Sequence, residues 1–113
     1  MRQEDKELLL KDLCARLPYG VICKSNSYRN ILFNSSHISL IESEEIKPYL
    51  RPMSSMTEEE KKENKHIAPG IEIENGVRIP NVHQIDWLNA HHFDYRGLIE
   101  KGLALKAPEE MYK

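Results

Sequence analysis

The sequence has few of the residues that mark several common classes of protein. Its only two cysteines, Cys14 and Cys23, form no CxxC pair and lack the His/Cys spacing of a structural zinc site, so we expect both thiols to be free and partly buried. The five glycines are scattered and form no phosphate-binding loop. The N-terminal stretch "MRQEDKELLL" has charged residues before any apolar run, without the long apolar stretch of a signal peptide or membrane span. We therefore expect a cytoplasmic protein.

An excess of positive charge is also missing. Lys and Arg together number 16 against 18 Asp and Glu, which gives a formal net charge of -2 and no overall field that would attract a polyanion. With 113 residues the chain suits one small domain, and we expect residues 1–113 to form a single unit.

The clearest element present is an N-terminal helix from about Glu4 to Arg16, which Pro18 should end. Apolar residues recur there at spacings of three and four, which places them on one face of the helix. This stripe consists of Leu9, Leu10, Leu13, Cys14 and Leu17.

Three short runs rich in β-branched and aromatic residues follow, "GVICKS", "YRNILFN" and "HISLIES", separated by Ser/Asn clusters. They predict an antiparallel meander with the N-terminal helix covering its buried face. Pro48 and Pro52 should then interrupt regular structure, and Thr57 with Glu60 forms a capping box that starts a polar, solvated helix.

The stretch "IEIENGVRIP" places Asn75-Gly76 between alternating apolar residues, which predicts a β-hairpin, with an irregular loop as the alternative. A helix capped by Asn81 should then run to about His91. Asp94 is suited to cap a shorter helical turn, and Gly102 to adopt a left-handed conformation. The expected fold is α+β: an N-terminal helix on a small antiparallel sheet, a polar central helix, a hairpin and a C-terminal helical segment.

The segment "WLNAHHFDYRGLI" raises the question of a metal or catalytic site. On a helix, His83 and His91 are too far apart for an i,i+4 chelate, and adjacent His91 and His92 point about 100° apart. Histidines at a helix end, followed by a capping Asp94, explain the pattern without a ligand. We expect no cofactor and no stoichiometric zinc, nickel or iron, although the fold could bring His37 or His66 to this region.

Three stretches resemble a family of small uncharacterised proteins carried by prophages and other mobile elements of gut anaerobes: "ELLLKDLCARLPYGV", "IKPYLRPMSSMTEEE" and "IDWLNAHHFDYRGLIEKGLALKAPEEMY". Together they cover about half the chain. The family has no established activity, so the resemblance implies a genomic context and no mechanism.

The leading hypothesis is a non-catalytic accessory protein of a phage or mobile element that binds another protein, because no nucleophile is placed with a base and aromatic and arginine residues are frequent interface hot spots. The candidate contacts are Tyr49, Arg51, Trp87, Tyr95 and Arg96. Trp87 could instead fill the core.

Two alternatives stay open. The first is a nucleic-acid-binding module, for which Lys24, Arg29, Lys47 and Arg51 would form a local basic patch despite the acidic total. The second is a metal-dependent enzyme using the region of His91, His92 and Asp94, which would require these side chains to converge in the fold.

Overall fold

The computed structural model of the protein describes residues 2–26, 29–67, 71–72, 78–79 and 82–112. Its elements, where η marks a short 3₁₀ helix, are α1 (Gln3–Arg16), η1 (Leu17–Tyr19), β1 (Ile22–Ser25), β2 (Asn30–Leu32), η2 (Ser35–His37), α2 (Ile38–Glu42), β3 (Ile46–Pro52), η3 (Met53–Ser55), α3 (Glu58–Ile67), β4 (Ile71–Glu72), β5 (Arg78–Ile79), α4 (Val82–Ala90), β6 (Phe93–Asp94) and β7 (Leu105–Lys106). The α+β class predicted from the sequence is confirmed. Within these ranges no helix combines the length and the apolar character that crossing a membrane requires.

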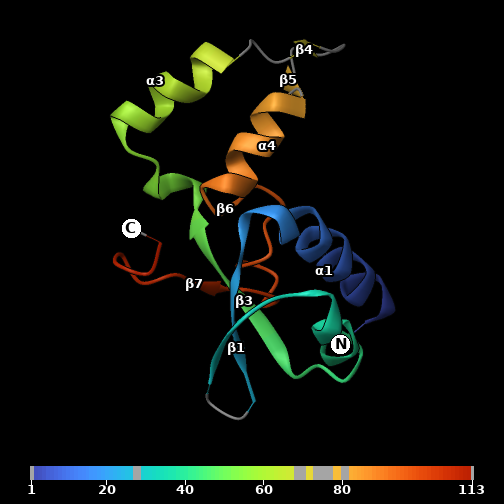
Figure 1. The fold of residues 1–113 in the computed structure, drawn as a ribbon. Helices are drawn as coiled ribbons and strands as arrows, with labels where there is room; N and C mark the ends of the chain where they lie inside the picture. The colour runs from blue at the N-terminus through green and yellow to red at the C-terminus, as the bar shows by residue number, and fades with distance from the viewer. Residues whose placement is uncertain (1, 27–28, 68–70, 73–77, 80–81, 113) are drawn as a thin grey trace.

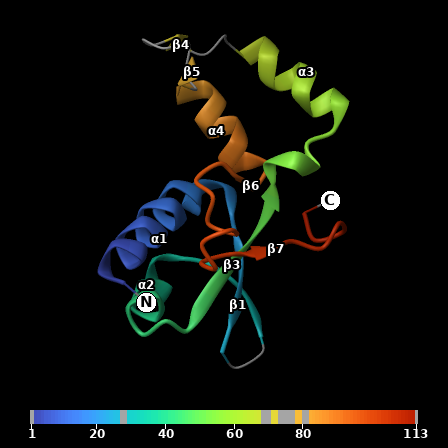
Figure 2. The same ribbon diagram turned by 180° about the vertical axis from the view of Figure 1, so that it is seen from behind.

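The main sheet is built around β3. Strand β1 pairs antiparallel with both β2 and β3, while β6 and β7 each pair with β3 in parallel. The sheet is therefore mixed, because two parallel pairs that the sequence did not predict join the antiparallel ones. Figures 1 and 2 show α3 and α4 at one end of the molecule and the β1–β2 hairpin at the opposite end.

Helix α1 forms where the sequence predicts it, but the face that it buries differs from the expected stripe. Leu9 and Leu13 are fully buried, whereas Leu10 and Cys14 are exposed. Asp12 and Arg16 occupy the buried face in their place. The expectation of a partly buried Cys14 was wrong, and an ion pair lies where an entirely apolar stripe was predicted.

The prediction of a third strand at "HISLIES" was wrong, because this segment lies in η2 and α2. The local cause is a capping box: the Asn34 side chain accepts a hydrogen bond from the backbone N–H of Ser36 at 2.9 Å, and Nδ1 of His37 accepts one from the backbone N–H of Asn34 at 3.2 Å. This start signal outweighs the alternation of apolar residues in the segment.

The prolines expected to break regular structure lie within β3 instead. The carbonyl of Leu50 accepts a hydrogen bond from the backbone N–H of Ala107, so it faces the edge occupied by β7. Along a strand, every second residue directs its backbone groups to the same edge, so Pro48 and Pro52 face that edge too. Because β7 pairs only with Tyr49 and Leu50, no ladder hydrogen bond is lost at either proline.

Later elements follow the predictions more closely. Helix α3 begins after Thr57 as expected, and β4 and β5 pair antiparallel, while the turn at Asn75-Gly76 lies outside the described residues. Asn81, the predicted cap of α4, also lies outside them. The second, shorter turn that Asp94 was expected to cap is present, because the described segment after Asp94 forms turns and Asp94 bonds to their backbone, and Gly102 has the predicted left-handed φ of 76°.

Two clusters of buried side chains hold these elements together. The larger joins α1 to the inner face of the sheet and to the turns after β6, through residues such as Leu9, Leu13, Phe33, Leu50 and Leu98. The smaller contains Trp87, Leu88 and Phe93, with Met56, Ile85 and Tyr95 packed against it. It packs α4 against β6 and against Met56, which follows η3.

Candidate functional site

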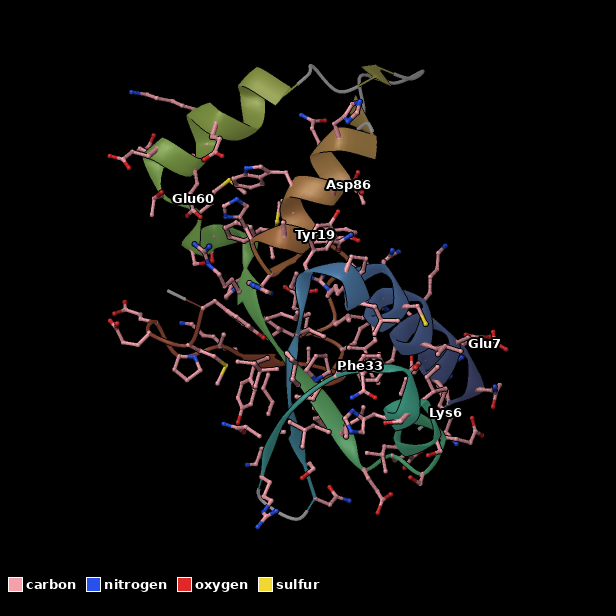
Figure 3. The ribbon with its side chains drawn as sticks, viewed as in Figure 1. Lys6, Glu7, Tyr19, Phe33, Glu60 and Asp86 are labelled. Atoms are coloured by element: carbon pink, nitrogen blue, oxygen red, sulfur yellow. The ribbon has the colours of Figure 1, made fainter. Side chains whose placement is uncertain are left out.

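A cleft of about 530 Å³ opens between the C-terminal segment and the region where β3 leads into α3. Arg51 at the end of β3, Glu60 in the first turn of α3 and His91 after α4 line one part of it. Lys106 and Tyr112, from the C-terminal segment, line another. Figure 3 shows Glu60 on α3. The volume lies within the range of about 300–1,000 Å³ that is typical of ligand sites.

Arg51 and Glu60 form a rigid ion pair in this cleft. Nη1 and Nη2 of Arg51 donate to the two carboxylate oxygens of Glu60 at 2.8 and 2.7 Å, and the guanidinium lies 4.1 Å from the centroid of the Phe93 ring. Arg51 holds the pKa of Glu60 at about 2, well below its usual value. A bidentate pair that also stacks on an aromatic ring is fixed in orientation before any ligand arrives.

The capping box of α3 positions Glu60 for this role. The backbone N–H of Thr57 donates to Oε1 of Glu60 at 3.0 Å, and the Thr57 hydroxyl accepts from the backbone N–H of Glu60 at 3.1 Å. One carboxylate therefore caps a helix and binds Arg51 at the same time. The sequence predicted the cap, but it carried no signal for the contact with Arg51.

The two adjacent histidines diverge. The His91 ring stacks on Trp87 with centroids 4.2 Å apart, and its Nδ1 lies 3.8 Å from Oε2 of Glu60. The His92 ring stacks on Tyr112 at 3.7 Å, and its buried Nδ1 has no hydrogen-bond partner among the described residues. Burial, assisted by the charge of Arg16, lowers the pKa of His92 to about 4, so this ring is neutral near pH 7.

His92 also turns the chain at the end of α4. Its φ is 64°, a left-handed conformation that is uncommon for a residue other than glycine. Its backbone carbonyl accepts a hydrogen bond of 2.8 Å from the N–H of Arg51, which places β6 beside β3. The next carboxylate, Asp94, accepts hydrogen bonds from the backbone N–H groups of Leu98 and Ile99 at 2.9 and 3.0 Å. Asp94 thus satisfies the backbone of the following turn.

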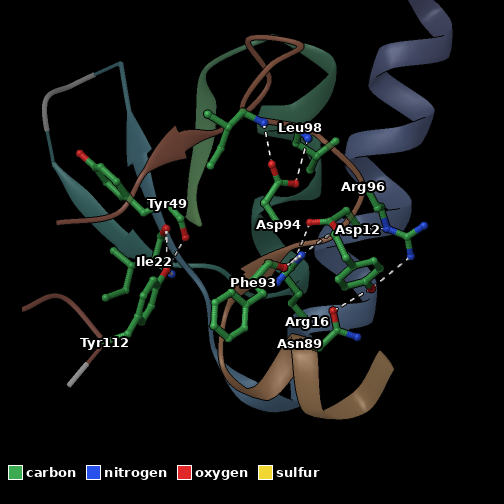
Figure 4. A network of polar contacts seen from close by, with 12 residues as sticks. Asp12, Arg16, Ile22, Tyr49, Asn89, Phe93, Asp94, Arg96, Leu98 and Tyr112 are labelled. Carbon is green, nitrogen blue, oxygen red and sulfur yellow. Dashed lines mark hydrogen bonds and ion pairs between the residues drawn. The ribbon is translucent and has the colours of Figure 1, made fainter. Parts of the chain in front are cut away.

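Tyr112 attaches the C-terminal segment to the sheet. Its hydroxyl accepts a hydrogen bond of 3.0 Å from the backbone N–H of Ile22 and donates one of 2.7 Å to the carbonyl of Tyr49 (Figure 4). Burial raises the pKa of Tyr112 to about 12. The same side chain therefore lines the cleft and forms hydrogen bonds to both β1 and β3.

A second polar network includes the backbone carbonyl of Phe93, the residue whose ring lies against Arg51. Nε and Nη2 of Arg16 donate to the carboxylate of Asp12 at 2.8 and 3.1 Å, and Nη2 also donates to the carbonyl of Phe93 at 2.7 Å (Figure 4). Arg96 donates to Asp12 at 3.1 Å. The Tyr95 hydroxyl donates to Asn89 at 2.8 Å. Asp12 and Arg16 are both fully buried, so this network is part of the core.

The five residues predicted as a contact surface fall into different environments. Arg51 lines the cleft, whereas Tyr49 is outside its described lining and contacts it through its backbone carbonyl, which accepts a hydrogen bond from the Tyr112 hydroxyl. Trp87 is only 8% exposed, and its ring stacks on the ring of His91. Tyr95 and Arg96 belong to the network around Asp12, outside the described lining of the cleft.

Sequence reasoning missed Glu60, Lys106 and Tyr112 as parts of the cleft. Within the part of the chain that the structure describes, no group of three or more His, Cys, Asp or Glu side chains is arranged to hold a metal ion. Comparison with known proteins adds no identity, since no protein-family model, curated protein or solved structure matches the chain.

Proposed function

We propose that this protein is a non-catalytic accessory protein of a phage or mobile element, acting in the cytoplasm by binding another protein in the cleft between η3, α3 and the C-terminal segment. The observation that carries the proposal is the Arg51–Glu60 pair, which is held by two hydrogen bonds, a helix cap and an aromatic ring at the edge of a cleft of about 530 Å³. A preorganised arginine loses little conformational entropy when a partner binds.

The residue types around this pair favour a protein partner. Arg, Tyr and Met are enriched at protein interfaces, and here Arg51 and Tyr112 line the cleft while Met53, in η3 next to it, is 42% exposed. Lys106 and Glu109 add one exposed charge of each sign to the lining. Such a surface suits a partner segment that carries both apolar and charged side chains.

The test uses exposed cleft residues, because Trp87 and Arg51 also support the fold. Lys106→Glu changes the charge of the lining without touching the Arg51–Glu60 pair, and Lys11→Glu makes the same change on the exposed side of α1. Tagged wild-type protein and both variants are used to capture partners from the native host. The recovered partner is then purified and titrated against each variant by calorimetry.

We expect wild type and Lys11→Glu to bind the purified partner equally and Lys106→Glu to bind it at least about tenfold more weakly, which corresponds to about 1.4 kcal/mol. A crosslink from the partner to the segment around Lys106 should accompany the interaction. Equal binding by all three proteins, or crosslinks confined to another face, would refute the proposed surface.

A further inference from the structure

Two lysines lie directly opposite each other on neighbouring strands of the main sheet. The β1–β3 register places Lys24 directly opposite Lys47, and both side chains are exposed. Directly opposed residues of an antiparallel pair extend from the same face of the sheet, and like charges in these positions destabilise it. Among the described residues, neither ammonium group has a hydrogen bond or an ion pair.

A depression of about 310 Å³ lies beside the pair. Lys24 and Lys47 line it together with Ser25, Asn26 and Leu105. One carboxylate, that of Glu44, also lines it, and this group lies 4.0 Å from Nζ of Lys6. The lining therefore keeps an excess of positive charge.

The register extends this polar row onto a third strand. Asn30 of β2 lies opposite Lys24, so an exposed amide and two ammonium groups follow one another across β2, β1 and β3. Arg51, which the sequence placed in the same basic patch, is bound to Glu60 instead. The structure thus removes Arg51 from the predicted patch and places Lys24 directly opposite Lys47.

From this arrangement we infer that the Lys24–Lys47 face is a binding site for a phosphate group. A phosphate placed between the two ammonium groups neutralises their repulsion, and its oxygens accept hydrogen bonds from several donors at once. Chloride is a single spherical ion and offers no such set of separate acceptor atoms. A local arrangement that costs stability in the empty protein is typical of functional sites. The inference is independent of the protein-binding cleft.

The same chemistry is offered by free phosphate compounds and by the backbone of a single-stranded nucleic acid. Pyrophosphate and a short oligothymidylate are therefore the two probes. Thermal unfolding is measured with low-millimolar pyrophosphate against sodium chloride of the same ionic strength, and oligothymidylate binding is measured by fluorescence anisotropy over a series of salt concentrations. The proteins are wild type, Lys24→Gln, Lys47→Gln and the matched control Lys11→Gln, all at exposed positions.

Wild type and Lys11→Gln should gain melting temperature with pyrophosphate, and the two sheet variants should lose most of that gain. If oligothymidylate also binds, each sheet variant should reduce the slope of log K against log salt by about 0.7, the value for one phosphate contact on a single strand. Binding of pyrophosphate alone would identify a free phosphate compound as the ligand. No response of wild type to either probe, or the same response in all four proteins, would overturn the inference.

Discussion

The buried ion pair of α1 allows a quantitative prediction for Asp12→Asn. Asp12 accepts two hydrogen bonds from Arg16 and one from Arg96, and Asp12 and Arg16 have no solvent-exposed surface. The substitution keeps the shape of the side chain but removes its negative charge. The guanidinium of Arg16 then keeps the Phe93 carbonyl, at 2.7 Å, and one neutral amide oxygen as acceptors, but it has lost the opposite charge.

The expected loss of unfolding free energy is about 3–5 kcal/mol, the usual cost of leaving a buried charge uncompensated. This is a large part of the roughly 5–15 kcal/mol that stabilises a typical domain. For a chain of this size each kcal/mol corresponds to about 4 °C, so the melting temperature should fall by roughly 12–20 °C. Replacing both charges, as in Asp12→Leu/Arg16→Met, should recover part of the loss because neither fully buried charge remains, although the Phe93 carbonyl and Arg96 each lose a partner.

Urea unfolding followed by circular dichroism measures these changes. Lys61→Gln is the control, because Lys61 bonds Glu58 at 3.2 Å on the exposed side of α3 and its loss should leave the midpoint unchanged. A loss below about 1 kcal/mol for Asp12→Asn would show that water reaches Arg16 and that the network is not a closed part of the core.

Three further predictions concern titratable groups. Cys14 is exposed and Cys23 is buried with its pKa raised to about 12, so a thiol reagent should label one cysteine per native chain and two after unfolding. Burial lowers the pKa of His92 from 6.5 to about 4, so between these pH values the unfolded chain binds a proton at His92 that the folded chain does not. The free energy of unfolding should therefore fall as pH drops from about 6.5 towards 4, and His92→Asn should make that decline shallower. Tyr112→Phe leaves the N–H of Ile22 without its acceptor, so it should lower the free energy of unfolding by about 1–3 kcal/mol and speed hydrogen exchange at that amide. Unchanged exchange at Ile22 would show that the Tyr112 hydroxyl does not bind this amide.

Short-range signals in the sequence were sufficient to predict several elements without knowledge of how the chain packs. Helix α1, the capped start of α3 and the left-handed Gly102 each depend on residues within a few positions of one another. Such interactions form in almost any tertiary context, which is why these predictions are confirmed. The error at Asn34 is of the same kind, because its capping box was present in the sequence but was not recognised.

Strand pairing depended on the whole fold. Strands β6 and β7 have two residues each, too few for a periodic pattern, and they exist because β3 presents free backbone groups to them. The prolines of β3 are tolerated for a reason that only the arrangement of its edges reveals. A short strand is stabilised by its neighbour, so its sequence alone does not specify it.

The candidate sites show the same division. The sequence by itself determined which side chains carry useful chemistry: it singled out Arg51, Lys24 and Lys47, and it marked Glu60 as a helix cap. Only the tertiary structure decided that Arg51 pairs with Glu60, and that Lys24 lies opposite Lys47 with no ion pair to any described residue. Charge and capping propensity are properties of single residues or of a few neighbours, whereas the partner of a charge is whatever the packed chain brings within hydrogen-bonding distance.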